Sequence, residues 1–306
     1  MKNKIICRVL TGPTASGKTK VSLELAEKNG WDILCMDSMQ IYRRMNIGTA
    51  KPTAEERARV PHYMLDICEP DESFSVAAYR ERAEALVKEK WQKEGREVLF
   101  VGGTGLYLQA MMHPMGMGQI PADEKLREEM NRLAVSVEGR QLLHRILESL
   151  DPETASRLPV NDTRRIIRAI EVTKGTGIPF SRQPVREEKS EFCWKVAALE
   201  LPRDILYERI NRRVEDMIRA GLADEVRDLL KEGIAPNAQS MQGIGYKEMI
   251  PYISNEWTLE KAVDAIKKGT RHYAKRQETF LRRLENVDRV DALTSDIQRQ
   301  TERILM

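Results

Sequence analysis

Cysteines, aromatic residues and long apolar runs are all scarce in this sequence of 306 residues. Only four cysteines occur, and none forms a C-x-x-C pair, so neither a zinc site nor a disulfide framework is supported. Cys7 and Cys35 fall within apolar segments, where a thiol acts as a small buried hydrophobe. No apolar run approaches the roughly 18 residues that a membrane-spanning helix needs. We therefore expect no association with a membrane.

A secretory signal is also missing. The N-terminal segment MKNKIICRVLTG has only a short apolar run, which leads directly into a glycine-rich motif. A signal peptide would not carry a functional motif at that place, so we expect a cytoplasmic protein. The length suits about two domains.

Charge is nearly balanced overall, with a net value of +3, but it is unevenly distributed. The segment Arg157 to Lys189 carries a net +4 and the segment Ala265 to Leu284 a net +6, which leaves −7 for the rest. Two basic segments in an otherwise acidic chain suggest a polyanionic partner larger than a metabolite. Either segment alone is also explained by a solvated helix face.

The strongest motif is GPTASGKT, which fits the phosphate-loop pattern G-x-x-x-x-G-K-[ST]. An apolar strand pattern precedes it and a helical pattern follows, as the motif requires. In such loops, backbone N–H groups and a helix N-terminus hold anionic oxygens, and the threonine hydroxyl can bind Mg²⁺. The predicted phosphate-binding residues are Gly12, Pro13, Thr14, Ala15, Ser16, Gly17, Lys18 and Thr19, with Thr19 as a metal ligand.

Alternating apolar and helical segments predict an α/β fold, a P-loop three-layer core with a parallel sheet. Apolar runs bounded by turn residues predict strands at Lys4–Leu10, Asp32–Met36, Tyr63–Cys68, Glu97–Val101 and Phe192–Leu201. Helices are predicted at Gly17–Lys28 and Ser75–Lys93, and the chain after the last strand reads as mostly helical.

Helical periodicity without a convincing strand runs from Ala122 to Lys174, between two clusters rich in glycine and proline. The simplest account is a helical insertion domain at residues 116–189. Residues 1–115 and 190–306 then form the P-loop core domain with C-terminal helices. The glycines and prolines at both junctions would let the insertion move, or they are ordinary loops.

An acidic residue is missing where many P-loop enzymes hold Mg²⁺, because the strand EVLFV ends in Gly102-Gly103-Thr104-Gly105. The other candidate is Asp37, which ends the strand DILCM. Asp37 as a Mg²⁺ partner indicates a kinase or NTPase, whereas Asp37 as a base indicates a transferase with another nucleophile. A helix or turn cap is the third interpretation. Thr104 likewise lies at a substrate or caps the helix that follows it.

Two arginines, Arg209 and Arg213, lie one helical turn apart, where like charges cost an isolated helix roughly 0.2–0.5 kcal/mol. A shared anion would remove this repulsion. Pairing with Asp216 or simple solvation is the alternative.

Motifs along nearly the whole chain resemble those of the tRNA dimethylallyltransferase (tRNA isopentenyltransferase) family. They are GPTASGKT, DSMQIY, IGTAKP, HYMLDI, GGTGLY, ERINRRVEDM, GIGYKE and TRHYAKRQETF, in that order. The resemblance implies transfer of a dimethylallyl group from dimethylallyl diphosphate to the N6 amine of the adenosine 3′ of the anticodon. The phosphate loop would then hold a diphosphate that leaves intact, with Mg²⁺ near Thr19.

The resemblance also implies roles for single residues. Asp37 would bind the N6 amine and act as general base, with Thr104 and Lys18 beside the reacting atoms. Arg209 and Arg213 would bind diphosphate.

Contacts with the tRNA anticodon stem-loop would come from three regions: the C-terminal helix, the residues around Gln40, and the helical insertion. The opposite, basic face of the C-terminal helix would meet RNA, while an apolar stripe on the same helix packs on the core. The stripe consists of Val263, Ile266, Tyr273, Phe280 and Leu284. Gln40 would read flanking bases, unless it is an ordinary surface glutamine. The implied tRNA-binding residues are Asp37, Ser38, Met39, Gln40, Thr104, Arg127, Arg164, Arg165, Ile166, Ile167, Arg168, Lys268, Arg271, Lys275 and Arg282.

Rival functions are an adenylate isopentenyltransferase, a P-loop metabolite kinase and a binding module without catalysis. The helical insertion and the basic C-terminal helix favour tRNA, and the missing acid disfavours a kinase. Eukaryotic family members often carry a C-terminal zinc finger, whereas no cysteine follows Cys193, so the chain looks bacterial in type. We expect a monomer.

Overall fold

The computed structural model describes residues 4–113, 120, 122–183 and 191–306. The chain divides into two compact units. Residues 1–112 and 189–306 form a core unit, and residues 113–188 form a helical unit. The boundaries expected at 115/116 and 189/190 both fall outside the described residues. Among the described residues, no helix combines the length and apolar character needed to cross a membrane.

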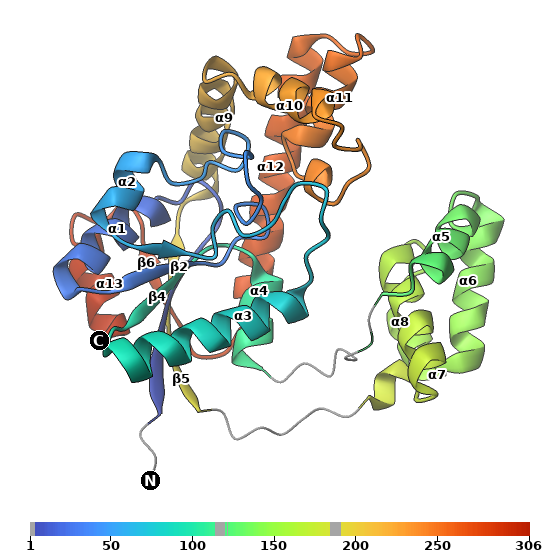
Figure 1. The fold of residues 1–306 in the computed structure, drawn as a ribbon, viewed down its shortest axis with the longest axis horizontal. Coiled ribbons are helices and arrows are strands. Elements are labelled where there is room, and N and C mark those ends of the chain that lie inside the picture. Colours follow the sequence, from blue (N-terminus) through green and yellow to red (C-terminus); the bar gives the residue numbers. More distant parts are fainter. Residues whose placement is uncertain (1–3, 114–119, 121, 184–190) are drawn as a thin grey trace. The chain divides into compact units, whose positions relative to one another are not determined.

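The core unit is built on a six-stranded sheet in which every strand pair is parallel (Figure 1). The strand order is β3-β2-β4-β1-β5-β6. A sheet of this kind is covered on both faces, so its strands read as continuous apolar runs. This confirms the predicted fold class. The strands are β1 (Ile5–Thr11), β2 (Asp32–Cys35), β3 (His62–Tyr63), β4 (Val98–Val101), β5 (Phe192–Glu200) and β6 (Val287–Asp291).

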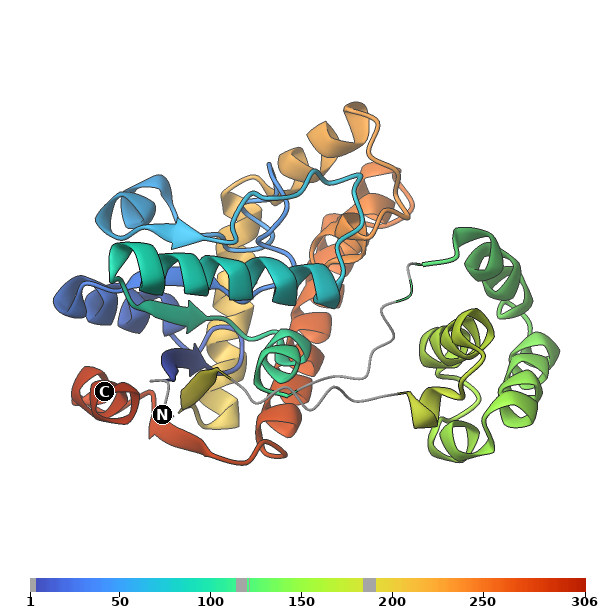
Figure 2. The same ribbon diagram turned by 60° about the horizontal axis from the view of Figure 1, so that its bottom comes forward.

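Successive residues along the central strands face opposite sides of the sheet and enter two different apolar cores. Val9 and Phe100 pack with one core, whereas their neighbours Leu10 and Leu99 pack with the other. The smaller core is closed by α1 (Lys18–Asn29) and α13 (Ile297–Leu305), which lie together in Figures 1 and 2. Three layers result.

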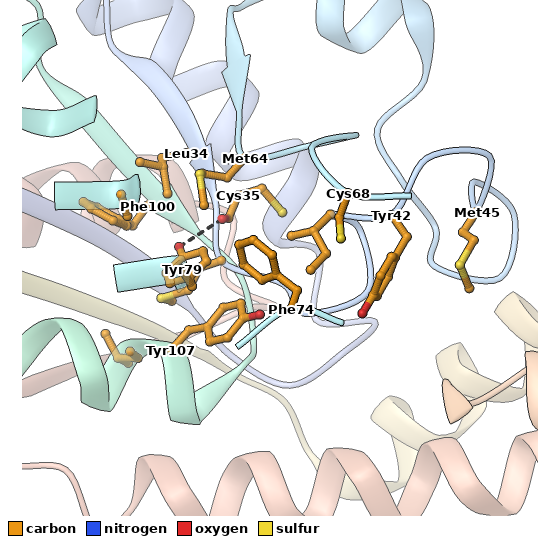
Figure 3. Close-up of a cluster of buried hydrophobic side chains, with 14 of the residues drawn as sticks. Leu34, Cys35, Tyr42, Met45, Met64, Cys68, Phe74, Tyr79, Phe100 and Tyr107 are labelled. Atoms are coloured by element: carbon orange, nitrogen blue, oxygen red, sulfur yellow. Dashed lines mark hydrogen bonds between the residues drawn. The ribbon is translucent and has the colours of Figure 1, made fainter. Parts of the chain in front are cut away.

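The larger core lies under α3 (Val76–Glu89) and α4 (Gly105–Met112). Figure 3 shows its centre, where the Tyr79 hydroxyl donates a hydrogen bond of 3.0 Å to the Cys35 carbonyl oxygen. The rings of Tyr79 and Tyr107 stack with their centroids 3.9 Å apart. Cys35 is buried, as the sequence predicts, and burial raises the pKa of its thiol.

The other helices of the core unit precede or follow the sheet strands. The short α2 follows the loop after β2, and α9 to α12 form the long helical segment between β5 and β6. Their bounds are α2 (Ala54–Arg59), α9 (Arg203–Arg219), α10 (Leu222–Lys231), α11 (Tyr246–Ile253) and α12 (Leu259–Leu281); a π-helical turn spans Lys90–Glu94 and a 3-10 turn Ser240–Gln242.

Two strand predictions differ from the structure. The run predicted as a strand at Tyr63–Cys68 leaves the sheet after Tyr63, because Met64 and Asp66 take positive φ angles of 61° and 52°. Conversely, β6 was not predicted from the sequence. At this edge of the sheet Val290 is buried, whereas Asp288, Arg289 and Asp291 are exposed, so the strand lacks a continuous apolar run.

The helical unit consists of α5 (Glu124–Leu133), α6 (Val137–Leu150), α7 (Pro152–Arg157), α8 (Thr163–Thr176) and a 3-10 turn at Phe180–Arg182. Its own apolar core includes Met130, Leu143, Leu147, Ile166 and Ile170. A separate core of this kind holds the unit together independently of the sheet.

Candidate active site

A cavity of about 140 Å³ opens at the carboxyl ends of the central strands of the core unit. The phosphate loop lines one side of it, and the residues that follow β2 and β4 line the other. Carboxyl ends of parallel strands are where open α/β sheets bind ligands. Of the predicted site residues, the cavity is lined by Thr14, Ala15, Ser16, Gly17, Lys18, Thr19, Asp37, Gln40 and Arg213.

The phosphate loop depends on backbone conformations that favour glycine. Gly12 and Gly17 have φ angles of 143° and 95°, and Ala15 also takes a positive value of 64°. A Cβ atom on Gly12 would lie 2.8 Å from the Leu199 carbonyl oxygen, so any side chain there would displace β5. No side chain caps α1, so its first N–H groups are free to bind an anion.

Lys18 folds back over the loop that precedes it. Its Nζ donates hydrogen bonds of 3.0 and 2.8 Å to the carbonyl oxygens of Gly12 and Pro13. Burial and the nearby charge of Arg213 lower the pKa of Lys18 to about 7, while Asp37 opposes the shift. The ammonium is thus poorly compensated, and a bound anion would stabilise its charged form.

Arg213 brings a second cation to the cavity. Burial lowers the pKa of its guanidinium, which no group in the described part of the chain hydrogen-bonds. The alternative of pairing with Asp216 does not occur, because Asp216 pairs with Arg219. Arg209 is half-buried one turn earlier and does not line the cavity. Of the predicted pair, Arg213 therefore lines the cavity and Arg209 does not.

Asp37 combines two of the interpretations considered from the sequence. Its Oδ1 accepts hydrogen bonds from the backbone N–H groups of Met39, at 2.8 Å, and Gln40, at 3.4 Å. This is a turn cap. Its Oδ2 has no hydrogen-bond partner among the described residues, and the side chain lines the cavity. One carboxylate oxygen thus fixes the turn and leaves the other for a ligand.

Thr104 lies on the turn that follows β4, next to Asp37. Its Oγ1 accepts a hydrogen bond of 3.1 Å from the Ser38 N–H, and its own N–H donates to the Met36 carbonyl oxygen at 3.3 Å. The turn is close to β2 because Gly102 carries no side chain: a Cβ there would lie 2.0 Å from the Met36 oxygen. The hydroxyl is therefore tied to the Asp37 turn.

Gln40 is a half-buried part of the cavity wall, so the interpretation as an ordinary surface residue does not describe it. Its Nε2 donates to the carbonyl oxygens of Thr49, at 3.1 Å, and Ala50, at 3.2 Å. The Cys35 thiol donates to its Oε1 at 3.2 Å. The amide holds the IGTAKP loop in place.

Helix α12 contributes to the cavity through two residues that sequence analysis did not assign to it. Tyr273 and Gln277 are both among the residues that line it. Sequence analysis placed Tyr273 in the core-packing stripe. Burial raises the pKa of Tyr273 to about 12, so its hydroxyl stays protonated at neutral pH. Helical spacing identifies the inward face of α12 but does not distinguish core contacts from cavity contacts.

The basic residues predicted on α12 divide into two groups. Lys268, Lys275 and Arg282 are exposed, Arg282 lying just past the last helical residue. Arg271 is half-buried, and its Nη1 donates a hydrogen bond of 2.7 Å to Oδ1 of Asn211 on α9. Arg271 therefore also joins two helices.

In the helical unit, Arg127 and Arg168 both pair with the buried carboxylate of Glu171. Burial alone would raise the pKa of Glu171, but these hydrogen bonds lower it. Arg127 thus joins α5 to α8. Of the predicted RNA-binding arginines in this unit, Arg164 and Arg165 are exposed.

The assignment of Ile166 and Ile167 to tRNA contacts needs correction. Their exposed fractions are 0% and 4%, and both pack in the core of the helical unit. The basic motif TRRIIR, residues 163–168, turns once around α8 and more, so it necessarily includes residues from the inward face. Only its outward-facing members are available to a partner.

The residues present suit a Mg²⁺ ion that takes most of its ligands from a bound anion and water. Thr19 lines the cavity, and Asp37 is the one carboxylate among the described residues that line it. Within the described ranges, no three His, Cys, Asp or Glu side chains cluster as a complete metal site. Mg²⁺ usually keeps several waters and is held by few protein oxygens together with substrate phosphates.

The phosphate loop lies at the carboxyl edge of an all-parallel sheet, and two cations and a carboxylate line the cavity beside it, so the chain is a P-loop protein. The particular family follows from comparison with known sequences. The chain belongs to the IPP transferase family, whose model matches residues 40–284.

Individual relatives match over almost their whole length. A tRNA dimethylallyltransferase from Pelotomaculum thermopropionicum is 44% identical, covering 97% of this chain and 96% of that protein. The crystal structure of a tRNA isopentenylpyrophosphate transferase from Bacillus halodurans is 43% identical with a TM-score of 0.72, covering 99% of this chain and 95% of that one. A tRNA delta(2)-isopentenylpyrophosphate transferase structure from Staphylococcus epidermidis is 37% identical, with a TM-score of 0.71 and 98% of both chains covered.

Proposed function

We propose that this chain is a tRNA dimethylallyltransferase. It transfers the dimethylallyl group of dimethylallyl diphosphate to N6 of the adenosine 3′ of the anticodon and releases diphosphate. The observation that carries this proposal is the pairing, in one cavity, of a phosphate loop with the free Oδ2 of Asp37. A leaving-group site and a proton acceptor then lie on either side of the reacting carbon.

The reaction exchanges one bond for another. The bond from N6 to allylic C1 forms, the bond from C1 to the diphosphate oxygen breaks, and the electron pair leaves with diphosphate. Negative charge grows on that leaving group, so fixed cations and N–H groups around it lower the barrier. The loop amides, the N-terminus of α1, Lys18 and Arg213 supply them.

The acceptor amine must lose a proton as it attacks. The free Oδ2 of Asp37 is placed to accept it, while Oδ1 holds the turn rigid through Met39 and Gln40. Thr104, hydrogen-bonded to Ser38, keeps the adjacent wall of the acceptor site in register with this turn. A carboxylate fixed in this way needs little rearrangement before the chemical step.

Mg²⁺ is part of the proposal. Thr19 would hold it, together with diphosphate oxygens and water, and the bound ion supplies positive charge to the leaving group. Lys18 and Arg213 would act on the same oxygens from the protein side.

The tRNA anticodon stem-loop would contact exposed basic residues of both units. These are Lys268 and Lys275 on α12, Arg282 just after it, and Arg164 and Arg165 in the helical unit. Arg127, Arg168 and Arg271 would act through the positions of the helices that they join. The target base must leave its stack to reach a cavity of this kind.

The deciding experiment supplies radiolabelled dimethylallyl diphosphate and Mg²⁺ with unmodified tRNA and, in parallel, with AMP. We expect label in RNA alone. Label in AMP alone would identify an adenylate isopentenyltransferase instead. ATP consumption without label transfer would identify a metabolite kinase, and either result would overturn the proposal.

A further inference from the structure

Gln277 on α12 is a buried polar side chain that connects two of the loops that line the cavity. Its Oε1 accepts a hydrogen bond of 2.8 Å from the N–H of Thr14 in the phosphate loop. Its Nε2 donates one of 2.8 Å to the carbonyl oxygen of Gly103, in the turn that carries Thr104. The residue as a whole is 6% exposed.

We propose that Gln277 is a positioning residue that fixes the leaving-group loop relative to the acceptor side of the reaction. This inference rests on the proposed function. The Gly103–Thr104 turn is itself bonded to Ser38, next to Asp37. Hydrogen bonds therefore connect the phosphate loop, through the Gln277 side chain and the Gly103–Thr104 turn, to Ser38, the residue that follows the proposed base.

The chemistry of the two partners determines how the amide is oriented. The Thr14 N–H only donates and the Gly103 carbonyl only accepts, so oxygen must face the first and nitrogen the second. A glutamine amide offers an acceptor and a permanent donor side by side at this side-chain length, whereas an ionised carboxylate offers acceptors only. A glutamate in its place would set a second acceptor against the Gly103 oxygen.

The fit around the amide is also tight. A Cβ atom on Gly103 would lie 2.2 Å from Nε2 of Gln277 and 3.1 Å from the Gly12 carbonyl oxygen. The glycine thus lets the turn, the amide and the phosphate loop approach one another. Tyr273, one helical turn before Gln277, lines the same wall, so this face of α12 holds both loops.

Positioning matters here because transfer occurs between two separately bound groups. Each loop still forms without the bridge, since β1, β4 and their turns have other contacts. What the bridge sets is the distance between the bound diphosphate and the incoming amine. A displacement of about 1 Å at a reacting centre can cost about 10²-fold in rate.

The test compares Gln277→Ala, which removes both hydrogen bonds, with Gln277→Glu, which keeps the shape but removes the donor. Thr279→Ala is the matched control, because Thr279 lies on the same helix, is exposed and bonds only to the Lys275 carbonyl oxygen. We expect kcat for transfer to fall about 10²-fold in Gln277→Ala and the control to behave as wild type.

Binding is measured separately with each substrate partner. Gln277→Ala should bind an anticodon stem-loop RNA alone, and inorganic diphosphate alone, as wild type does. Gln277→Glu should also lose kcat and, because it adds a negative charge, bind inorganic diphosphate more weakly. Wild-type kcat in both variants would overturn the inference, and so would losses of both affinities that fully match the loss of rate.

Hydrogen exchange gives a readout that does not require activity. In Gln277→Ala, peptides containing Thr14 and Gly103 should both exchange faster, while β2 keeps its protection. Unchanged exchange in both peptides would contradict the bridge even in an inactive protein. If the wild type labels RNA and the Gln277 variants are fully active as well, this inference is overturned and the proposed function stands.

Discussion

At the scale of single residues, the site depends on side chains whose atoms have separate tasks. Asp37 uses one oxygen to cap a turn and presents the other to the cavity. Lys18 bonds to its own loop and carries a destabilised charge. Substitutions that separate these tasks are therefore more informative than deletions.

Asp37→Asn and Asp37→Ala provide such a separation. Asparagine retains an oxygen for the turn but cannot accept the N6 proton, whereas alanine loses both. We expect kcat to fall about 10²–10⁴-fold in each, with retained tRNA affinity, as measured by single-turnover transfer and by RNA binding. Normal turnover by Asp37→Asn would refute the role as base.

Lys18 predicts a pH dependence for anion binding. Its pKa is lowered to about 7, so the free protein holds the ammonium below that pH and loses it above. An anion favours the charged form, and the affinity for inorganic diphosphate should fall by up to about tenfold per pH unit above 7.

Inorganic diphosphate also titrates, so the informative quantity is the ratio of Kd values for Lys18→Met and wild type. This ratio should shrink as the pH rises from 6 to 9, since the wild type loses the charge that the variant lacks. A ratio that stays constant across this range would show that Lys18 keeps its charge.

At the scale of elements, the IGTAKP loop is held by a carboxylate from a distant helix. Glu225 on α10 accepts hydrogen bonds from the N–H groups of Asn46, Ile47 and Gly48, at 2.8–3.1 Å, and one of 2.6 Å from the Tyr246 hydroxyl. The loop then lines the cavity with Thr49, Ala50 and Pro52.

Removing this carboxylate should cost more than removing one of its donors. Glu225→Ala leaves several N–H groups without an acceptor and should lower the free energy of unfolding by about 3 kcal/mol. Tyr246→Phe removes one hydrogen bond and should cost about 1 kcal/mol. Urea unfolding followed by tryptophan fluorescence measures both, and equal costs would contradict this account.

The two faces of α12 should also be separable. Lys275 is exposed on the face away from Tyr273 and Gln277. Lys275→Ala should weaken tRNA binding and reduce the slope of log affinity against log salt by about 1, without changing the affinity for inorganic diphosphate. Lys267→Ala is the control, because Lys267 already pairs with Glu215. A loss confined to diphosphate affinity would argue against an RNA-facing helix.

At the scale of the whole molecule, the chain has two units with separate cores. All four tryptophans, at positions 31, 91, 194 and 257, lie in the core unit. Tryptophan fluorescence therefore reports that unit alone, whereas circular dichroism reports the helices of both.

Asp151 offers a way to perturb the helical unit selectively. It is buried and accepts hydrogen bonds from the N–H and hydroxyl groups of Thr154 and Ser181, at 2.6–3.1 Å. Burial alone would raise the pKa of Asp151, but these bonds lower it to about 2, from 3.8. Its contribution to stability is therefore present above pH 3.8 and is lost as the pH falls towards about 2.

We expect Asp151→Asn to destabilise the helical unit at neutral pH, with the difference from wild type shrinking as the pH falls from 4 towards 2. The far-UV transition should shift while the tryptophan transition and the diphosphate affinity stay unchanged. A shift of both transitions together would mean that the two units unfold as one.

The sequence by itself determined the features that depend on neighbouring residues. Continuous apolar runs specify buried parallel strands, and glycines at positive φ specify the phosphate loop. The absence of an acid after β4 and the presence of Asp37 after β2 are also local, and the resemblance to a family rests on short motifs that are each read locally. These features were enough to predict the fold class and the main residues of the cavity.

Tertiary structure alone decided which distant residues complete the site. Gln277 accepts a hydrogen bond from Thr14, which lies 263 positions earlier in the sequence, and Glu225 accepts one from Gly48, which lies 177 positions earlier. Helical spacing gave α12 and α8 an inward face, yet could not tell that Tyr273 lines a cavity while Ile166 fills a core. A periodic pattern predicts which side chains of a helix are buried. Which residues those side chains contact is decided only when separate segments pack together.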